Sequence, residues 1–197
     1  STSSSICSKY LMDTKNLENF LKSFGSKVEK KAKENLAASK DSMGKARGNT
    51  ALGKSIRYKV VPTATGFSTQ FYMEDYGEYL DKGVSGNKTK RSFTNYKNKT
   101  QSSPYSYTTK GPPIDILSKW IKRKGIKGHG VKKGRSKNTG QFVSGFAYLI
   151  SRKIKRDGIK SISFFQKPLG LYYRELKDDL LKKLKLDIES YLTTFYR

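Results

Sequence analysis

Four carboxylates lie close together in the chain, at Glu74, Asp75, Glu78 and Asp81. Clustered carboxylates are ligands for Mg²⁺ or Mn²⁺, and nearby lysines could attract DNA, so a metal-dependent nuclease is one interpretation. The other interpretation is structural. The first two carboxylates favour the positive N-terminal end of a short helix, and the other two pair with lysines. We favour the structural interpretation and predict no metal site.

Nucleophilic catalysis would need a serine or cysteine together with a histidine and an orienting acid. The chain has one histidine, His129, which lies between two glycines in a basic segment, and one cysteine, Cys7. A single cysteine cannot form a disulfide within the chain or a cysteine-based zinc site. We therefore expect a protein that is not an enzyme, has no catalytic residue and holds no cofactor.

Positive charge is the strongest chemical signal in the chain. There are 41 Lys and Arg against 16 Asp and Glu, a net charge of +25. Residues 82–140 alone carry 16 basic residues and one acidic residue, a net charge of +15. Such a charge predicts strong, salt-sensitive attraction to polyanions such as nucleic acids. The candidates for proximity to nucleic acid are Lys88, Lys90, Arg91, Lys97, Lys99, Lys132, Lys133, Arg135 and Lys137.

The segment 84–110 mixes these cations with Phe93, Tyr96, Tyr105 and Tyr107 and shows no aliphatic periodicity. Aromatic rings could stack on bases or cover a protein surface, whereas a solvated insertion is the plainer alternative. Loops of this length inside a compact domain are usually functional or disordered. We give contact with a polyanion and contact with a neighbouring subunit equal weight, and expect the segment to become ordered on assembly.

A β-hairpin is predicted for residues 55–74. Apolar and polar residues alternate there in two runs, which is the period of half-buried strands. A turn over 62–66, with a proline and a glycine, joins the two runs. One face of the hairpin gathers the apolar side chains, and those of the second run are expected beneath the terminal helices: Ile56, Tyr58, Val60, Phe67, Phe71 and Met73.

Five helices are predicted from apolar residues spaced three or four apart and from residues typical of helix ends. They cover about residues 14–39, 75–82, 112–124, 142–156 and 171–195. Residues 127–140 are expected to form a basic, glycine-rich loop, and residues 159–165 a short strand or an extended arm.

Together these elements predict an α+β fold in which a small antiparallel sheet packs against long N- and C-terminal helices, with long basic loop insertions. Residues 1–13 are expected to form a flexible arm, and residues 14–197 a single domain with insertions at about 84–111 and 127–141. No apolar run approaches the roughly 20 residues of a membrane span, so no membrane partner is expected.

The hairpin runs into Asp75-Tyr76-Gly77-Glu78-Tyr79-Leu80-Asp81-Lys82-Gly83-Val84. This stretch resembles the Tyr-Ala-x-Tyr-(Leu/Val)-Glu-x-Gly-Thr core of the neck and tail-completion proteins of tailed bacteriophages, the HK97 gp10-like and lambda minor tail protein Z-like proteins. Val84 stands where that family has threonine. Two further landmarks follow in the family's order: Trp120-Ile121-Lys122-Arg123-Lys124-Gly125-Ile126, and Phe164-Phe165-Gln166-Lys167-Pro168-Leu169 before the last helix.

The resemblance implies a structural protein of the virion, located at the neck or the head-proximal end of the tail and assembled in the host cytoplasm. It implies a homo-oligomeric ring or collar that completes the head–tail junction around the DNA path. The implied partners are other neck, portal or tail proteins, and DNA through non-specific contact. The candidates for the subunit interface are Tyr76, Tyr79, Asp81, Phe93, Tyr96, Tyr105, Tyr107, Phe164, Phe165 and Pro168.

Two other classes remain as alternatives. The first is a basic nucleic-acid-binding protein that works in solution, which the net charge alone would favour. The second is the metal-dependent nuclease that the four clustered carboxylates suggest. The nuclease ranks last, because the resemblance implies a structural protein and because no complete catalytic constellation is visible.

Overall fold

The computed structural model describes residues 14–41, 44, 46–63, 66–126, 133–135 and 142–195. Within them lie six helices and three antiparallel sheets of two strands each, so the predicted α+β class is confirmed. These residues group into two compact units. The first unit takes its residues from 1–74, 96–98 and 164–197, and the second from 75–95 and 99–163. The single domain stays a prediction, and the predicted arm at 1–13 lies outside the described residues.

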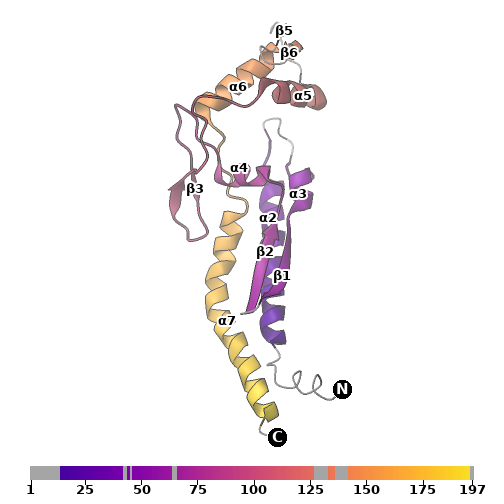
Figure 1. The fold of residues 1–197 in the computed structure, drawn as a ribbon, viewed down its shortest axis with the longest axis vertical. Helices are drawn as coiled ribbons and strands as arrows, with labels where there is room; N and C mark the ends of the chain where they lie inside the picture. The colour runs from indigo at the N-terminus through magenta and orange to yellow at the C-terminus, as the bar shows by residue number, and fades with distance from the viewer. Residues whose placement is uncertain are drawn as a thin grey trace, which may run out of the picture. The chain divides into compact units, whose positions relative to one another are not determined.

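Helix α2 (Lys15–Ala38) is the element on which the first unit is built. It buries Phe24, Val28, Ala32 and Leu36, which follow one another at intervals of four residues and therefore share a face. This is the apolar stripe that the sequence predicts. The hairpin of β1 (Arg57–Thr63) and β2 (Gly66–Tyr72) packs along α2, and helix α7 (Gln166–Phe195) also packs against α2 (Figure 1).

Strands β1 (Arg57–Thr63) and β2 (Gly66–Tyr72) form the predicted hairpin. The ring of Tyr58 packs so closely onto Gly25 of α2 that a Cβ on that glycine would lie 2.3 Å from the ring. The turn predicted over 62–66 is too long, because β1 continues through Pro62. A strand at the edge of a sheet tolerates a residue without an N–H group.

Phe71 of β2 packs against two other aromatic rings of the first unit. Its ring meets the rings of Phe24 and Phe165 edge to face, with centroids 6.3 Å and 5.3 Å away. Phe67, Phe71 and Met73 are half-buried rather than fully buried. A sheet of two strands is narrow, and side chains at its margins therefore stay partly open to water.

Helix α7 begins at Gln166, earlier than the predicted Leu171. Pro168 falls in its first turn, where a missing N–H group costs no intrahelical hydrogen bond. The motif with two phenylalanines and a proline thus belongs to the start of the helix rather than to a separate arm. Before it, residues 159–163 form neither a helix nor a named strand, Ile159 forms a β-bridge with Val84, and Ser163 has a positive φ of 46°.

The N-terminal end of α2 is capped by a residue of α7. Asp187 is 1% exposed, and its carboxylate accepts hydrogen bonds from the backbone N–H groups of Asn16 (3.2 Å) and Leu17 (3.0 Å). It also accepts one from the side-chain amide of Asn16 at 2.8 Å. The Thr14 side chain, at the N-cap position, makes no such bond. A carboxylate at this end of a helix also suits the helix dipole.

The second unit begins with α4 (Tyr76–Lys82), which is the short helix predicted for 75–82, and Gly83 closes it with φ of 74°. The segment 84–110 is more than a loop, because β3 (Ser92–Thr94) and β4 (Thr100–Ser102) form a hairpin within it. The two strands hold one apolar residue, Phe93, among their six residues, so no apolar alternation predicts this hairpin.

Helices α5 (Ile114–Lys124) and α6 (Gly145–Asp157) pack together in the second unit. The Ser151 hydroxyl of α6 donates a hydrogen bond to the Pro112 carbonyl ahead of α5 at 2.7 Å. Helix α5 ends as predicted at Gly125, which is left-handed, with φ of 65°.

Helix α6 starts later than the predicted residue 142. Residues Phe142–Ser144 form strand β6, which pairs with β5 (Lys133–Arg135). The loop predicted over 127–140 therefore contains a strand, and the rest of that range lies outside the described residues. Among the residues that the structure describes, no helix has the length and apolar character needed to cross a membrane.

Candidate polyanion-binding site

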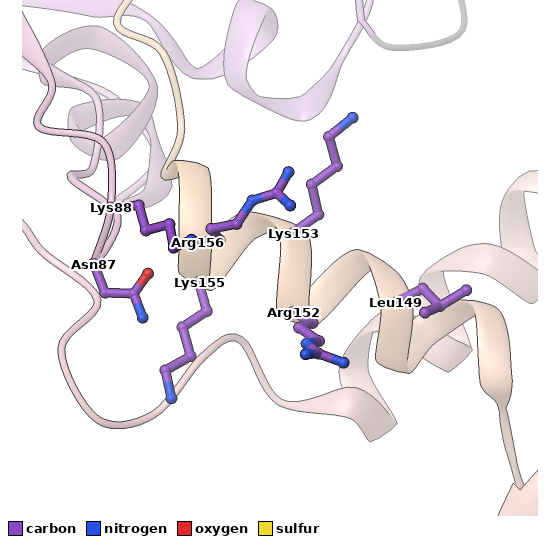
Figure 2. A pocket seen from close by; sticks show the side chains of 7 residues that line it. All are labelled: Asn87, Lys88, Leu149, Arg152, Lys153, Lys155 and Arg156. Carbon is purple, nitrogen blue, oxygen red and sulfur yellow. The ribbon is translucent and has the colours of Figure 1, made fainter.

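The last turn of α6 is capped by backbone groups of residues 86–89. The N–H groups of Asn87 and Lys88 donate hydrogen bonds to the carbonyls of Lys155 (2.9 Å) and Arg156 (3.0 Å). Carbonyls in the last turn of a helix have no partner within the helix, so these bonds satisfy them. The bonds also bring the Lys88 side chain beside the basic residues at the end of α6 (Figure 2).

Two glycines allow this close approach. A Cβ on Gly86 would lie 2.2 Å from the carbonyl oxygen of Arg156, and a Cβ on Gly158 would lie 2.1 Å from the carbonyl oxygen of Val84. Gly158 also has φ of 70°, a left-handed conformation that favours glycine. A side chain at either position would push the two segments apart, so the glycines fix the place of Lys88 relative to α6.

An open pocket of about 620 Å³ lies along this contact. Its lining combines two residues of the capping segment with five residues of α6 (Figure 2): Asn87, Lys88, Leu149, Arg152, Lys153, Lys155 and Arg156. We call these seven residues the basic pocket. Five of them are Lys or Arg and none is acidic, so the pocket concentrates positive charge.

One of these five cations is neutralised by an ion pair. Arg156 binds Asp157 through two hydrogen bonds, from Nε to Oδ1 at 2.7 Å and from Nη2 to Oδ2 at 2.9 Å. This guanidinium, assisted by the charges of Lys153 and Arg91, holds the pKa of Asp157 below its ordinary value. Asp157 therefore stays ionised at neutral pH and keeps Arg156 occupied.

Within the part of the chain that the structure describes, no carboxylate forms an ion pair with any of the other four cations. Lys155 donates from Nζ to the Thr109 carbonyl at 2.6 Å, which leaves its charge unbalanced. Lys88, Arg152 and Lys153 are exposed. Among the described residues, Lys88 and Arg152 have no hydrogen-bond or ion-pair partner for their side chains. A phosphate, sulfate or carboxylate entering the pocket would therefore meet cations that no other group already neutralises.

Of the nine basic residues predicted to lie near nucleic acid, Lys88 lines the basic pocket. Arg91 lies next to it and donates from Nε to the carbonyl of Asp157 at 2.8 Å. Lys90, Lys97 and Lys99 are exposed, and Lys97 lies over the ring of Tyr96, 5.6 Å from its centroid.

The remaining candidates lie in the second basic stretch. For Lys133 and Arg135 the structure describes the backbone, in β5, and Lys132 and Lys137 lie outside the described residues. These four residues therefore stay predictions.

The sequence prediction missed the basic residues of α6. When the sequence alone is considered, Arg152, Lys153, Lys155 and Arg156 need no other interpretation than basic charges that suit the C-terminal end of a helix. That interpretation accounts for their position on the helix but gives no sign of a pocket. The pocket exists because residues 86–89 cap the same helix end, and no local pattern reports such a long-range contact.

The ten candidates for a subunit interface divide by exposure. Tyr76 and Tyr79 are 47% and 46% exposed, and Tyr96, Tyr105 and Tyr107 are half-buried. The other five lie in the interior of the chain: Asp81, Phe93, Phe164, Phe165 and Pro168. In the single chain, the motif residues before α7 pack in the interior, and the ten interface candidates stay predictions.

Tyr79 of α4 and Tyr105 form an aromatic cluster. The rings of Tyr79 and Tyr105 meet edge to face with centroids 4.5 Å apart, and the Tyr105 hydroxyl donates a hydrogen bond to the Glu78 carboxylate. That bond raises the pKa of Tyr105 to about 12 and lowers the pKa of Glu78. Tyr79, Tyr105 and Tyr107 line one pocket, and burial raises the pKa of Tyr107.

The four carboxylates of the possible nuclease site do not come together. Glu78 bonds to Tyr105 and pairs with Lys82 at 3.4 Å, while Asp81 is 3% exposed. Within the described ranges, no group of three or more His, Cys, Asp or Glu could hold a metal ion. His129 and Cys7 lie outside those ranges. The described residues thus give the nuclease interpretation no support.

The fold and the site define a basic α+β protein whose surface is suited to anions. No family model, curated protein or solved structure matches the chain. Its function therefore has to be inferred from its own residues.

Proposed function

We propose that the chain is a structural virion protein of a tailed bacteriophage. It would form a homo-oligomeric ring or collar at the neck or the head-proximal end of the tail, around the DNA path. The observation that carries the proposal is the position of the three motifs that resemble that family. The first forms α4 and ends at Gly83, the second ends α5 at Gly125, and the third leads into α7.

This arrangement supports the resemblance because each motif coincides with a structural boundary. A glycine with positive φ ends the first two helices, and a proline in the first turn opens the last one. The order is hairpin, short helix, middle helix and long C-terminal helix, which is the order that the family resemblance implies.

Exposed apolar residues on α7 support self-association. Leu181, Ile188 and Leu192 are 65%, 41% and 47% exposed. They are seven and four residues apart, so they lie on one face of the helix. We call these three residues the α7 stripe. Apolar patches on a protein surface commonly mark contacts with other proteins.

The charge of the protein supports a position beside DNA. A protein that surrounds a DNA path needs attraction to phosphate without recognition of sequence, which lysine and arginine side chains supply. The net charge of +25 and the basic pocket both fit this requirement.

Substitution within the α7 stripe tests the assembly. Leu181→Glu places a charge on the exposed stripe, and we expect it to abolish the ring that the wild-type chain forms, alone or on its neck and tail partners. Thr193→Glu is the control, because it likewise adds one negative charge at an exposed position of α7, but off the stripe. Ring formation is measured by electron microscopy and by mass in solution, with circular dichroism to check folding. Rings that persist in the Leu181→Glu protein would contradict this role for α7.

The alternative function is a nucleic-acid-binding protein that works in solution, and the basic pocket is the observation that favours it. Such a protein would bind duplex DNA tightly as a monomer or dimer. A neck protein would bind DNA weakly and gain its ring on the portal or the tail. Mass measurements and a salt titration of DNA binding on the same sample separate the two.

A further inference from the structure

We propose that the basic pocket binds the phosphate backbone of duplex DNA and that Asp157 limits its affinity by occupying Arg156. This inference deepens the proposed function and depends on it for the presence of DNA beside the chain. It assigns the contact to residues of α6 and the capping segment, most of which were not among the predicted DNA-proximal residues.

The side chains in the pocket match phosphate. Arg152 presents a planar guanidinium that can bind two oxygens at once, whereas Lys88 and Lys153 act as point charges on flexible stems. The amide of Asn87 adds an uncharged donor. No acidic side chain lines the pocket, so an anion that enters it meets no directly opposing charge there.

The lining favours the sugar–phosphate backbone over exposed bases. Proteins that hold single strands combine cations with aromatic rings on which successive bases stack. The basic pocket has no aromatic residue, and its apolar member is Leu149. A duplex keeps its bases stacked inside and presents phosphates outside, so it can bind the cations of the pocket that are not paired and needs no ring. Duplex DNA is therefore the partner that this lining fits best.

Asp157 acts as an internal competitor for Arg156. Its two carboxylate oxygens take the Nε and Nη2 donors at 2.7 Å and 2.9 Å, the same paired geometry that a phosphate would use. Arg156 therefore contributes little to DNA binding until this pair opens. The pair keeps the contact weak enough for DNA to pass, which is the behaviour that a structural protein on a DNA path requires.

The first experiment removes cations from the pocket. The double variant Lys88→Ala/Arg152→Ala is compared with wild type for binding of a labelled mixed-sequence duplex over a range of salt concentrations. Each lost phosphate contact should lower the slope of log K against log salt by about 0.9, which is about eightfold in affinity near 0.1 M salt. Both side chains are exposed, so the fold should survive their removal.

The matched control is Lys22→Ala/Lys182→Ala. It removes the same charge, but from lysines of the first unit that pair with Glu18 (2.6 Å) and Asp179 (3.2 Å). We expect its slope to stay close to that of wild type. Equal losses in the two double variants, or no duplex binding by the wild-type chain at low salt, would overturn the site.

The second experiment releases Arg156. Asp157→Asn should tighten duplex binding by up to about eightfold near 0.1 M salt and steepen the salt slope by up to about 0.9, because one more cation becomes available. Asp179→Asn removes an equivalent carboxylate from α7 and should have a much smaller effect. Unchanged or weaker binding by the Asp157→Asn protein would refute the competition by Asp157.

Competition identifies the class of partner. Unlabelled duplex, single-stranded DNA of equal length and poly-glutamate are each titrated against the labelled duplex bound to the protein. Stronger competition by the unlabelled duplex than by the other two supports the proposal. Competition by poly-glutamate as strong as that by the duplex would show a site for acidic proteins and overturn it. The ring assay tests the proposed function separately. If no preparation forms rings but the salt slope still depends on the pocket residues, the proposed function is wrong and this site remains. If rings form but the salt slope does not depend on the pocket residues, the site alone is wrong.

Discussion

At the scale of single residues, the hydrogen bond from Tyr105 to Glu78 makes a prediction about pH. The bond raises the pKa of Tyr105 to about 12, because ionisation would lose the donated proton and place a second negative charge beside the carboxylate. The folded-state pKa lies above the ordinary value of 10, so the bond's contribution to stability is complete below pH 10. It is lost as the pH rises through about 12.

Glu78→Gln should bring the pKa of Tyr105 down toward 10, because the charged acceptor is gone. Ultraviolet difference titration against Tyr105→Phe isolates this one tyrosine from the other twelve among the 13 in the chain. Glu74→Gln is the control, since it removes an equal charge four residues earlier in the chain. A Tyr105 pKa that stays near 12 without the Glu78 charge would show that the bond is not its cause.

Asp187 shows the limit of prediction at the residue scale. The helix predicted over 14–39 starts at Thr14, a residue type that commonly caps a helix with its own side chain. The structure satisfies the N–H groups of Asn16 and Leu17 with Asp187 instead. The two partners are far apart in the sequence, so no local preference records the bond.

At the scale of elements, Phe71 makes a prediction about stability. Phe→Ala costs about 3–5 kcal/mol when the ring is fully buried, and the half-buried ring of Phe71 should cost less, at about 2 kcal/mol. Urea denaturation followed by circular dichroism measures the loss. Phe67→Ala is the matched control on the same strand, and it should cost less because Phe67 takes part in neither of the ring contacts with Phe24 and Phe165. Equal losses would mean that those two ring contacts add nothing beyond burial.

The elements that the sequence predicts well are those with a strong apolar period. Helix α2 and the β1–β2 hairpin follow from spacings of four and of two residues, and the helix ends at Gly83, Gly125 and Gly158 follow from glycine's access to positive φ. The hairpins β3–β4 and β5–β6 were not predicted. Their strands have three residues each, which is too short to show a period.

At the scale of the whole molecule, the state of residues 84–110 decides how the chain would assemble. The sequence predicts that this segment is mobile in the free protein and ordered in a particle. The structure gives it partners in its own chain. The N–H groups of Val84, Ser85 and Lys88 donate to the carbonyls of Ile159 (2.9 Å), Tyr105 (2.8 Å) and Arg156 (3.0 Å). Ordering a residue costs about 1–2 kcal/mol of backbone entropy, and such bonds help to offset it without a neighbour.

Hydrogen exchange on the isolated chain tests this difference. We expect the amides of residues 84–88 to exchange slowly in the monomer, because their bonds cap α6 and cross to residue 159. Residues 108–110 serve as an internal reference, since no backbone hydrogen bond of their N–H groups is among those of the described residues, and they should exchange fast. Slow exchange at 84–88 would mean that the segment enters a ring as a preformed surface with Lys88 already beside α6. Fast exchange there, with protection gained only in the assembled particle, would restore folding on assembly and would leave the basic pocket incomplete until the ring forms.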